Sequence, residues 1–307
     1  MTNKVVFITG ASRGIGKACA VELADAGFDI AVTARTVKEG EAREHSSTLR
    51  ESDTSPLPGS LESTEDAIRA KGVDCLAVQA DLLDAASLGA AVATVLERMG
   101  RIDVVIHNGR YIGPGHMDQF MDTPVELLRT QMEANVFAPL MINKLVLPQM
   151  IARGSGDIVN ITSGSGYGDP TKPAGSGGWG MGYGISKGAF QRIAGFLHTE
   201  LGEKGIRCFN VQPGLIATER IGQDMAKFGI TNKGAPMEVM GKVVRWLVTD
   251  PDADRYSGVN VEAQFFCHEK GLLPGWDGPQ LLDNNIAYDQ SAENLARLER
   301  ELAERLG

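Results

Sequence analysis

The sequence has no long apolar run, and this absence argues against a membrane-spanning protein. No stretch approaches the roughly 18 consecutive apolar residues of a membrane span. The first apolar run, Val5–Ile8, is also too short for a signal peptide. The four cysteines are far apart, with neither a C-x-x-C pair nor a zinc-site spacing, so we expect free thiols in a reducing cytoplasm. They are Cys19, Cys75, Cys208 and Cys267.

The sequence also has fewer basic residues than acidic residues. The chain has 30 Lys and Arg against 39 Asp and Glu, a net charge of −9. An acidic chain argues against nucleic acid or an anionic membrane as the main partner. The 307 residues are 43% hydrophobic, and no break in composition divides them, so we expect one globular domain with a large core.

Predicted strands and helices alternate along the chain. The strand Val5–Ile8, a glycine-rich turn, a helix of about a dozen residues and the strand Asp29–Thr33 form a βαβ unit. Because the strands are short apolar runs, we predict an α/β fold, a Rossmann-type doubly wound parallel sheet with helices on both faces. Further strands are expected in "VDCLAVQADL", "IDVVIHNG", "GDIVNIT", "IRCFNVQPG" and "GVNVEA", and further helices in "SLGAAVATVLERMG", Val125–Met150 and Tyr183–Lys204.

Three segments interrupt this alternation. Residues 36–63 are polar and rich in Ser and Pro, which predicts a solvated surface insertion. Residues 164–182 form a glycine-rich insertion in which Tyr167, Trp179 and Met181 are expected to border the substrate pocket. Residues 271–307 are predicted to be a tail with an amphipathic helix that packs on the body or on another subunit. The apolar stripe of that helix is Leu295, Leu298, Leu302 and Leu306.

A glycine-rich turn, "TGASRGIG", joins the first strand to the first helix. Glycines let the backbone N–H groups approach a ligand closely, and the start of a helix carries partial positive charge. Between a strand and a helix, this pattern predicts a dinucleotide site that binds the pyrophosphate. Its predicted contacts are Gly10, Ser12, Arg13, Gly14, Ile15 and Gly16.

The end of the second predicted strand bears on which dinucleotide binds. An NAD site usually has a carboxylate there for the ribose 2′-hydroxyl, whereas this chain has Ala34 and then Arg35. Arg13 in the glycine turn adds a second guanidinium, and guanidinium groups match phosphate geometry. The pattern predicts NADP(H); the alternative is that both arginines are solvated surface residues.

Tyr183 and Lys187 are four residues apart in a predicted helix. This spacing places the two side chains on one helix face. A nearby ammonium lowers the pKa of a phenol, which produces a proton donor and acceptor useful near neutral pH. The spacing alone also fits two ordinary helix residues.

Together, the glycine turn, the strand order and the Tyr-x-x-x-Lys pattern resemble the classical short-chain dehydrogenase/reductase family over Lys4–Ala263. The resemblance implies an NADP-binding catalytic domain over residues 1–270. Its implied catalytic acid and base is Tyr183, and Lys187 lowers the pKa of that phenol and binds the nicotinamide ribose. Ser163 orients the substrate oxygen, and Asn135 holds a proton-relay water.

The resemblance also implies cofactor contacts beyond the glycine turn. Asp81 and Leu82 match the pair that contacts adenine, and Asn108 matches an asparagine of the family's "NNAG" motif. Residues 219–236 correspond to a mobile lid. Its Met, Phe and Ile residues suggest either a partly apolar substrate or packing into the core. The segment that closes over the nicotinamide corresponds to Pro213, Gly214, Ile216 and Thr218.

The chain departs from the family pattern at several positions. "NNAG" is replaced by "HNGR", in which His107 either titrates or acts as a neutral hydrogen-bonding group. Arg110 either enters the substrate pocket to pair with a carboxylate or phosphate, or holds the following loop. The wide spacing between Ser163 and Tyr183 makes Ser165 a rival for the serine role. "VNVEAQ" lacks the usual glycine pair after the last strand.

The sequence therefore predicts an NADP(H)-dependent oxidoreductase that acts on a carbonyl or secondary alcohol substrate. The alternatives are a non-catalytic NADPH-binding regulatory protein on the same fold and a structural subunit. Family resemblance and the two long predicted helices suggest a homotetramer or homodimer.

Overall fold

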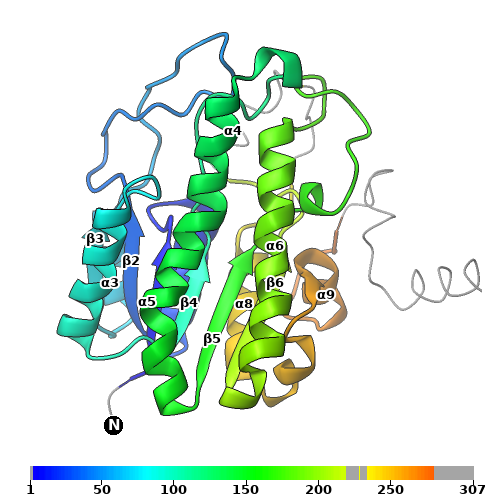
Figure 1. Ribbon diagram of the computed structural model, residues 1–307. Coiled ribbons are helices and arrows are strands. Elements are labelled where there is room, and N and C mark those ends of the chain that lie inside the picture. The colour runs from blue at the N-terminus through cyan, green and yellow to red at the C-terminus, as the bar shows by residue number, and fades with distance from the viewer. Residues whose placement is uncertain (1–2, 219–227, 229–233, 280–307) are drawn as a thin grey trace, which may run out of the picture.

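The computed structural model describes residues 3–218, 228 and 234–279, and its centre is one parallel sheet (Figure 1). Seven strands occur in the order β3-β2-β1-β4-β5-β6-β7. The strands are β1 (Val5–Thr9), β2 (Asp29–Ala34), β3 (Cys75–Gln79), β4 (Val104–His107), β5 (Gly156–Ile161), β6 (Ile206–Gln212) and β7 (Asn260–Glu262). The predicted Rossmann-type parallel sheet is confirmed.

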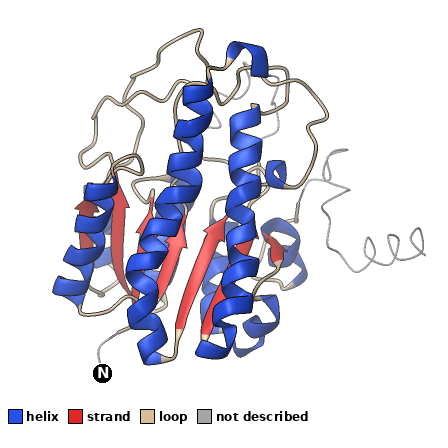
Figure 2. Ribbon diagram, in the orientation of Figure 1, coloured by secondary structure: helices blue, strands red, loops and turns tan. Residues whose placement is uncertain are grey.

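Helices cover both faces of the sheet (Figure 2). One face packs against α1 (Gly14–Asp25), α2 (Leu61–Arg69), α8 (Glu238–Thr249) and α9 (Ala263–Glu269). The other face packs against α3 (Ala85–Met99), α5 (Ala138–Arg153) and α6 (Met181–Leu201). The long helix predicted at Val125–Met150 consists of α4 (Val125–Met132), a π-helical turn (Glu133–Phe137) and α5. Among the described residues, the remaining short helices are Phe120–Asp122, Gly164–Gly166, Gly202–Lys204 and Pro251–Tyr256.

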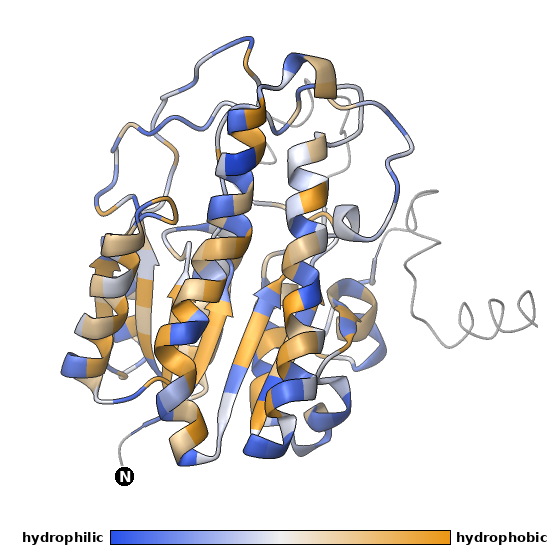
Figure 3. Cartoon of the chain, in the orientation of Figure 1, coloured by the Kyte–Doolittle hydropathy of each residue, from blue (hydrophilic) through white to orange (hydrophobic). Residues whose placement is uncertain are grey.

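Strand β1 shows why the strands carry no alternation of apolar and polar residues. Val6 and Ile8 are fully buried in the core on the α1 side, and Val5 and Phe7 in the core on the α5 side. Successive side chains of a strand point to opposite faces, so a strand covered on both faces is apolar at every position. Figure 3 shows these apolar strands between the helical layers.

The winding direction of the sheet changes between β1 and β4. From β1 the chain proceeds outward to β2 and β3, then returns to β4 on the other side and proceeds outward to β7. At such a switch point the connections after the two central strands turn to opposite faces and leave a crevice at the carboxyl ends of the strands. The topology therefore places the ligand site after β1 and β4.

The predicted surface insertion at residues 36–63 is only partly solvated. His45, Ser46, Ser47 and Thr48 are buried. The Thr48 Oγ1 donates a hydrogen bond to an Asp118 carboxylate oxygen over 2.6 Å. Polar residues can be buried when their groups are hydrogen-bonded, so polarity alone misled the prediction here. The end of this segment, from Leu61, already forms α2.

Part of the predicted periphery lies outside the described residues. This applies to most of the lid at 219–236 and to the leucine stripe of the tail. Within the described ranges, no helix has the length and apolar character needed to cross a membrane.

Candidate active site

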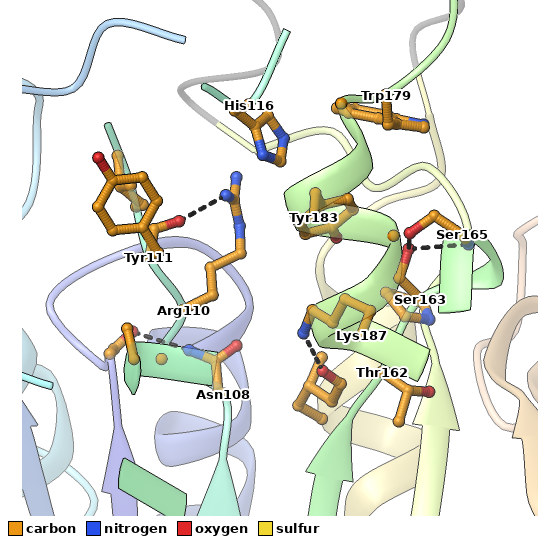
Figure 4. A pocket seen from close by; sticks show the side chains of 18 of the residues that line it. Asn108, Arg110, Tyr111, His116, Thr162, Ser163, Ser165, Trp179, Tyr183 and Lys187 are labelled. Carbon is orange, nitrogen blue, oxygen red and sulfur yellow. Dashed lines mark hydrogen bonds between the residues drawn. The ribbon is translucent and has the colours of Figure 1, made fainter. Parts of the chain in front are cut away.

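A cavity of about 1370 Å³ lies at the carboxyl ends of the strands. It is larger than the roughly 300–1,000 Å³ typical of small-molecule pockets, so it has room for a dinucleotide and a substrate together. Its walls contain all the predicted site residues except Gly16 and Asn135, which lie just behind them. Figure 4 shows the part of the cavity around Tyr183.

The glycine turn at the floor of the cavity is held against the end of β4. Gly10 has a φ of +68°, a conformation that favours glycine. The Asn108 Nδ2 donates hydrogen bonds to the backbone oxygens of Thr9 and Gly10, over 3.1 and 2.9 Å. A Cβ on Gly16 would lie 2.5 Å from the Gly10 oxygen and 2.6 Å from the Asn108 Nδ2. The turn thus leaves no space for a side chain at residue 16, and it presents the start of α1 to the cavity.

Replacing Gly16 with alanine is expected to lower the free energy of unfolding by about 1–3 kcal/mol, because the added methyl group overpacks this turn. Dinucleotide binding should weaken in parallel if, as the sequence predicts, the same turn binds the pyrophosphate. Urea denaturation and fluorescence titration measure the two effects. Gly89→Ala is the matched control. Gly89 lies in α3, where an added Cβ would have no neighbour within 4 Å outside the local helix backbone. Equal stability of the two variants would contradict the packing argument.

The end of the cavity beside β2 contains Arg35, Glu41 and Arg43. Among the described residues, the Arg35 guanidinium makes no hydrogen bond or ion pair. Glu41 is an acid that the sequence analysis did not consider. One of its oxygens accepts the backbone N–H groups of Val37 and Lys38, and the other pairs with the Arg43 Nη2 at 2.7 Å. These hydrogen bonds lower the pKa of Glu41 and engage both oxygens within the loop.

Arg13 is placed differently from Arg35. Its guanidinium donates hydrogen bonds to the backbone oxygens of Leu57, Pro58 and Gly59, over 3.3, 2.8 and 2.6 Å. Arg13 therefore fastens the insertion to the edge of the cavity, whereas the Arg35 guanidinium has no such partner among the described residues. The sequence could not reveal this, because the partners of Arg13 are more than forty residues away.

The segment after β6 also borders the cavity. Gln264, near the start of α9, donates hydrogen bonds to the backbone oxygens of Pro213 and Leu215, over 2.9 and 3.0 Å. Strand β7 continues directly into α9, where the family pattern has a glycine pair, and this places Gln264 against that segment. The other residues predicted to contact the cofactor, Asp81, Leu82, Gly214, Ile216 and Thr218, line the cavity as well.

Tyr183 and Lys187 both face the cavity from the first turns of α6 (Figure 4). Lys187 is 3% exposed, and its Nζ donates a hydrogen bond of 2.7 Å to the Ile161 oxygen at the end of β5. Burial, together with the charge of Arg110, lowers the pKa of Lys187 to about 7. The structure therefore brings together the two residues of the Tyr-x-x-x-Lys pattern.

Ser163 and Ser165 lie side by side at the end of β5 (Figure 4). The Ser165 Oγ donates a hydrogen bond of 3.0 Å to the Ser163 Oγ. Both line the same cavity as Tyr183, so the geometry leaves the choice between the two serines open.

Asn135 lies in the π-helical turn, behind the cavity wall. Its Oδ1 accepts the Tyr111 backbone N–H at 2.7 Å, and its Nδ2 donates to the Ser186 Oγ at 2.9 Å. The side chain thus joins the loop after β4 to α6. Such π-helical turns are frequent at functional sites, and the predicted role of Asn135 in holding a water stays a prediction.

His116 lies near Tyr183 without a clear sequence signal, whereas Trp179 was expected at the pocket border. The ring of His116 packs edge-on against Tyr183, with centroids 4.4 Å apart. Trp179, from the glycine-rich insertion, packs 5.1 Å from His116 and 5.7 Å from Tyr183. His116 follows β4 in an irregular loop, so only its position after a central strand could have pointed to it.

His107, by contrast, points away from the cavity. Its Nε2 is 2.8 Å from the Asn143 Oδ1 in α5, and burial lowers its pKa to about 4. The neutral, hydrogen-bonding alternative therefore describes this residue.

Comparison with known proteins agrees with this geometry. The family model for short chain dehydrogenases matches residues 4–55 and 54–227. Dehydrogenase/reductase SDR family member 7 from Homo sapiens is 32% identical over 227 residues, which cover 74% of this chain and 59% of that protein. Oxidoreductase UcpA from Salmonella typhimurium is 32% identical over 220 residues, or 71% of each chain. The match to the mammalian protein thus spans less than two thirds of its length.

Solved structures share the fold. An NAD⁺-bound xylitol dehydrogenase superposes with a TM-score of 0.68 at 25% identity and covers 85% of this chain and 97% of its own. A short-chain dehydrogenase/reductase from Burkholderia xenovorans gives a TM-score of 0.68 at 24% identity, covering 85% and 94%.

Proposed function

Because the chain belongs to the short-chain dehydrogenase family, we propose that it is an NADP(H)-dependent oxidoreductase acting on a carbonyl or secondary alcohol substrate. The observation that carries this proposal is the shared cavity. Tyr183, Lys187 and the Ser163–Ser165 pair line one cavity with the glycine turn and Arg35. A non-catalytic protein has no need for this set of groups around a dinucleotide site.

The cofactor fits the residues present. The glycine turn leaves no space for a Cβ at Gly16 and presents the start of α1, which suits a pyrophosphate. Arg35, with its guanidinium uncommitted among the described residues, suits the 2′-phosphate of NADP, and Glu41 is engaged in its own loop. When bound, NADP(H) supplies or accepts the hydride.

The protein's own groups handle the proton. In the reductive direction, the hydroxyl groups of Ser163 and Tyr183 donate hydrogen bonds to the carbonyl oxygen and polarise it. Tyr183 gives its proton to that oxygen as the alcohol forms. The charge of Lys187 stabilises the phenolate that remains. In the oxidative direction the phenolate takes the proton from the alcohol.

Wild-type protein is expected to bind NADPH at least tenfold more tightly than NADH, a difference of about 1.4 kcal/mol. Arg35→Ala should remove most of this preference by weakening NADPH binding alone, because NADH has no 2′-phosphate for the guanidinium. Fluorescence titration with each dinucleotide measures both affinities.

Arg13→Ala is the comparison variant. Since Arg13 holds the carbonyls of residues 57–59, its loss should affect NADPH and NADH alike. Equal affinity of the wild type for the two dinucleotides, or a preference for NADH, would refute the NADP assignment. Binding of neither would refute the oxidoreductase proposal.

Self-association is part of the proposal. Large apolar side chains are exposed on the helices around α5 and α6, whose ribbons carry many apolar residues in Figure 3. Such faces are typical of protein interfaces and support a homodimer or homotetramer through these helices. The exposed residues are Phe137, Leu140, Leu145, Ile185 and Phe196.

A further inference from the structure

Arg110 lies beside the candidate catalytic tyrosine. It follows Asn108 and Gly109 after β4, and its Cζ is 5.6 Å from the centroid of the Tyr183 ring (Figure 4). Its Nη1 donates a hydrogen bond of 2.9 Å to the Tyr111 backbone oxygen. The N–H of Tyr111 is bound in turn by Asn135. The backbone that carries Arg110 is therefore fixed with the guanidinium at the wall of the cavity.

Among the described residues, no acid balances the charge of Arg110. A guanidinium has five N–H donors. Within the described ranges, the Arg110 guanidinium makes one hydrogen bond and no ion pair. Its charge interacts with Tyr183, whose ring it lies against, and with Lys187, which is also a cation. His116 packs against the same ring. Burial lowers the pKa of both Arg110 and Lys187, because each cation has lost solvent without gaining a carboxylate. A bound anion would relieve this cost.

The described lining of the cavity has a net positive charge, opposite in sign to that of the whole chain. Its walls contain six Lys and Arg residues against three Asp and Glu, whereas the whole chain has a net charge of −9. A cleft lined by charge of one sign concentrates ligands of the other sign. Arg35 and the glycine turn account for the phosphates of the dinucleotide. Arg110, beside Tyr183, remains for the substrate.

We propose that Arg110 binds a carboxylate of the substrate, so that the enzyme acts on oxo acids and the matching hydroxy acids. This inference rests on the proposed oxidoreductase function. A carboxylate paired with a guanidinium through two hydrogen bonds lies about 2.8 Å from the guanidinium nitrogens. The guanidinium packs against the Tyr183 ring, so the two groups are close together. One small substrate can place its carboxylate on Arg110 and its carbonyl oxygen on the Tyr183 hydroxyl only when few bonds separate these two groups. The substrate class is a 2-oxo or 3-oxo acid.

The surroundings of Tyr183 suggest a suitable probe. His116 and Trp179 form an aromatic wall next to the phenol, which suits a planar apolar substituent on the carbonyl carbon. Phenylglyoxylate combines a phenyl ring, a ketone and an adjacent carboxylate. Its methyl ester has the same ring and ketone without the negative charge.

The test measures binding rather than turnover. Protein saturated with NADP⁺, which cannot reduce a ketone, is titrated with phenylglyoxylate and with methyl phenylglyoxylate in a calorimeter. Wild-type protein is expected to bind the acid at least tenfold more tightly than the ester. Arg110→Ala should bind both alike, with its NADP⁺ affinity unchanged. Arg110→Lys should keep part of the preference, because an ammonium retains the charge without the bidentate geometry.

Several outcomes would overturn the assignment. Equal binding of acid and ester by the wild type would do so without any variant, as would binding of neither. A loss of NADP⁺ affinity in Arg110→Ala, with the acid preference intact, would assign the guanidinium to the cofactor instead. These results leave the oxidoreductase proposal standing, since that proposal fails separately if the wild type binds no dinucleotide.

Discussion

Replacing Tyr183 with phenylalanine is expected to lower kcat by about 10²- to 10⁴-fold, the usual contribution of a positioned general acid. The ring still packs against His116 and Trp179 in this variant, so the cavity keeps its shape. NADPH affinity should therefore stay near the wild-type value. Steady-state kinetics with a carbonyl substrate found by screening, together with a fluorescence titration of NADPH, measures the two quantities.

The matched control for this variant is Tyr167→Phe. Tyr167 is a second phenol of the same cavity, and its hydroxyl donates a hydrogen bond to Glu262 rather than facing Lys187. We expect Tyr167→Phe to keep most of the activity. Unchanged turnover in Tyr183→Phe would show that another group supplies the proton, and it would reopen the alternative of a regulatory protein without catalysis.

Replacing Lys187 with methionine is expected to remove most of the activity. It should also remove the part of the pH dependence of the unfolding free energy that comes from Lys187. The ammonium contributes the electrostatic stabilisation of the phenolate, and the loss of one such group typically costs about 10²- to 10³-fold in kcat. Methionine preserves the length and apolar contacts of the side chain. The separate effect on stability does not depend on any substrate and can be measured on the cofactor-free protein.

The sign of that pH dependence follows from the low pKa of Lys187. The folded protein releases this proton near pH 7, whereas the unfolded chain keeps it until the ordinary value of 10.5. Between these values the unfolded state binds more protons, so stability rises with pH. Below pH 7 both states hold the proton, and this group contributes no slope. Subtracting the unfolding free energy of Lys187→Met from that of the wild type should give a curve that rises by a few kcal/mol from pH 7 towards 10.

Urea denaturation at several pH values between 6 and 9.5 gives this difference curve, in which the titration of all other groups cancels. Lys204→Met, which removes an exposed lysine just beyond α6, should give a flat curve. A flat curve for Lys187→Met as well would mean that the buried amine keeps an ordinary pKa. In that case water would solvate the Lys187 ammonium although its side chain is buried in the structure.

Much of the fold could be predicted because its signals are local. The apolar strands and the glycines of "TGASRGIG" lie within segments of about ten residues, where periodicity and backbone freedom act directly. The four-residue spacing of Tyr183 and Lys187 is local in the same sense, so the helix that carries them sets their common face. The element boundaries were predicted less accurately. The helix predicted at Tyr183–Lys204 extends from Met181 to Leu201, and the one predicted at Val125–Met150 contains a π-helical turn.

The hydrogen-bond partners of individual polar side chains could not be predicted from local patterns. Arg13 looked equivalent to Arg35 in the sequence, yet it binds the carbonyls of residues 57–59. The buried run at residues 45–48 looked like a solvated loop until its hydrogen bonds to the segment at 117–118 were seen. Each of these contacts joins residues far apart in the chain, and no local pattern encodes such a pairing.

The parallel βαβ order, the glycine turn and the Tyr–Lys pair follow from the amino-acid sequence, because they depend on short-range geometry. Which charges share the cavity depends instead on how the folded chain packs. This packing places Arg110 against Tyr183 and close to Lys187, and it engages Glu41 within its own loop. The reason is physical: the energy of a charged group depends on which other groups surround it after burial, and packing alone brings those groups together.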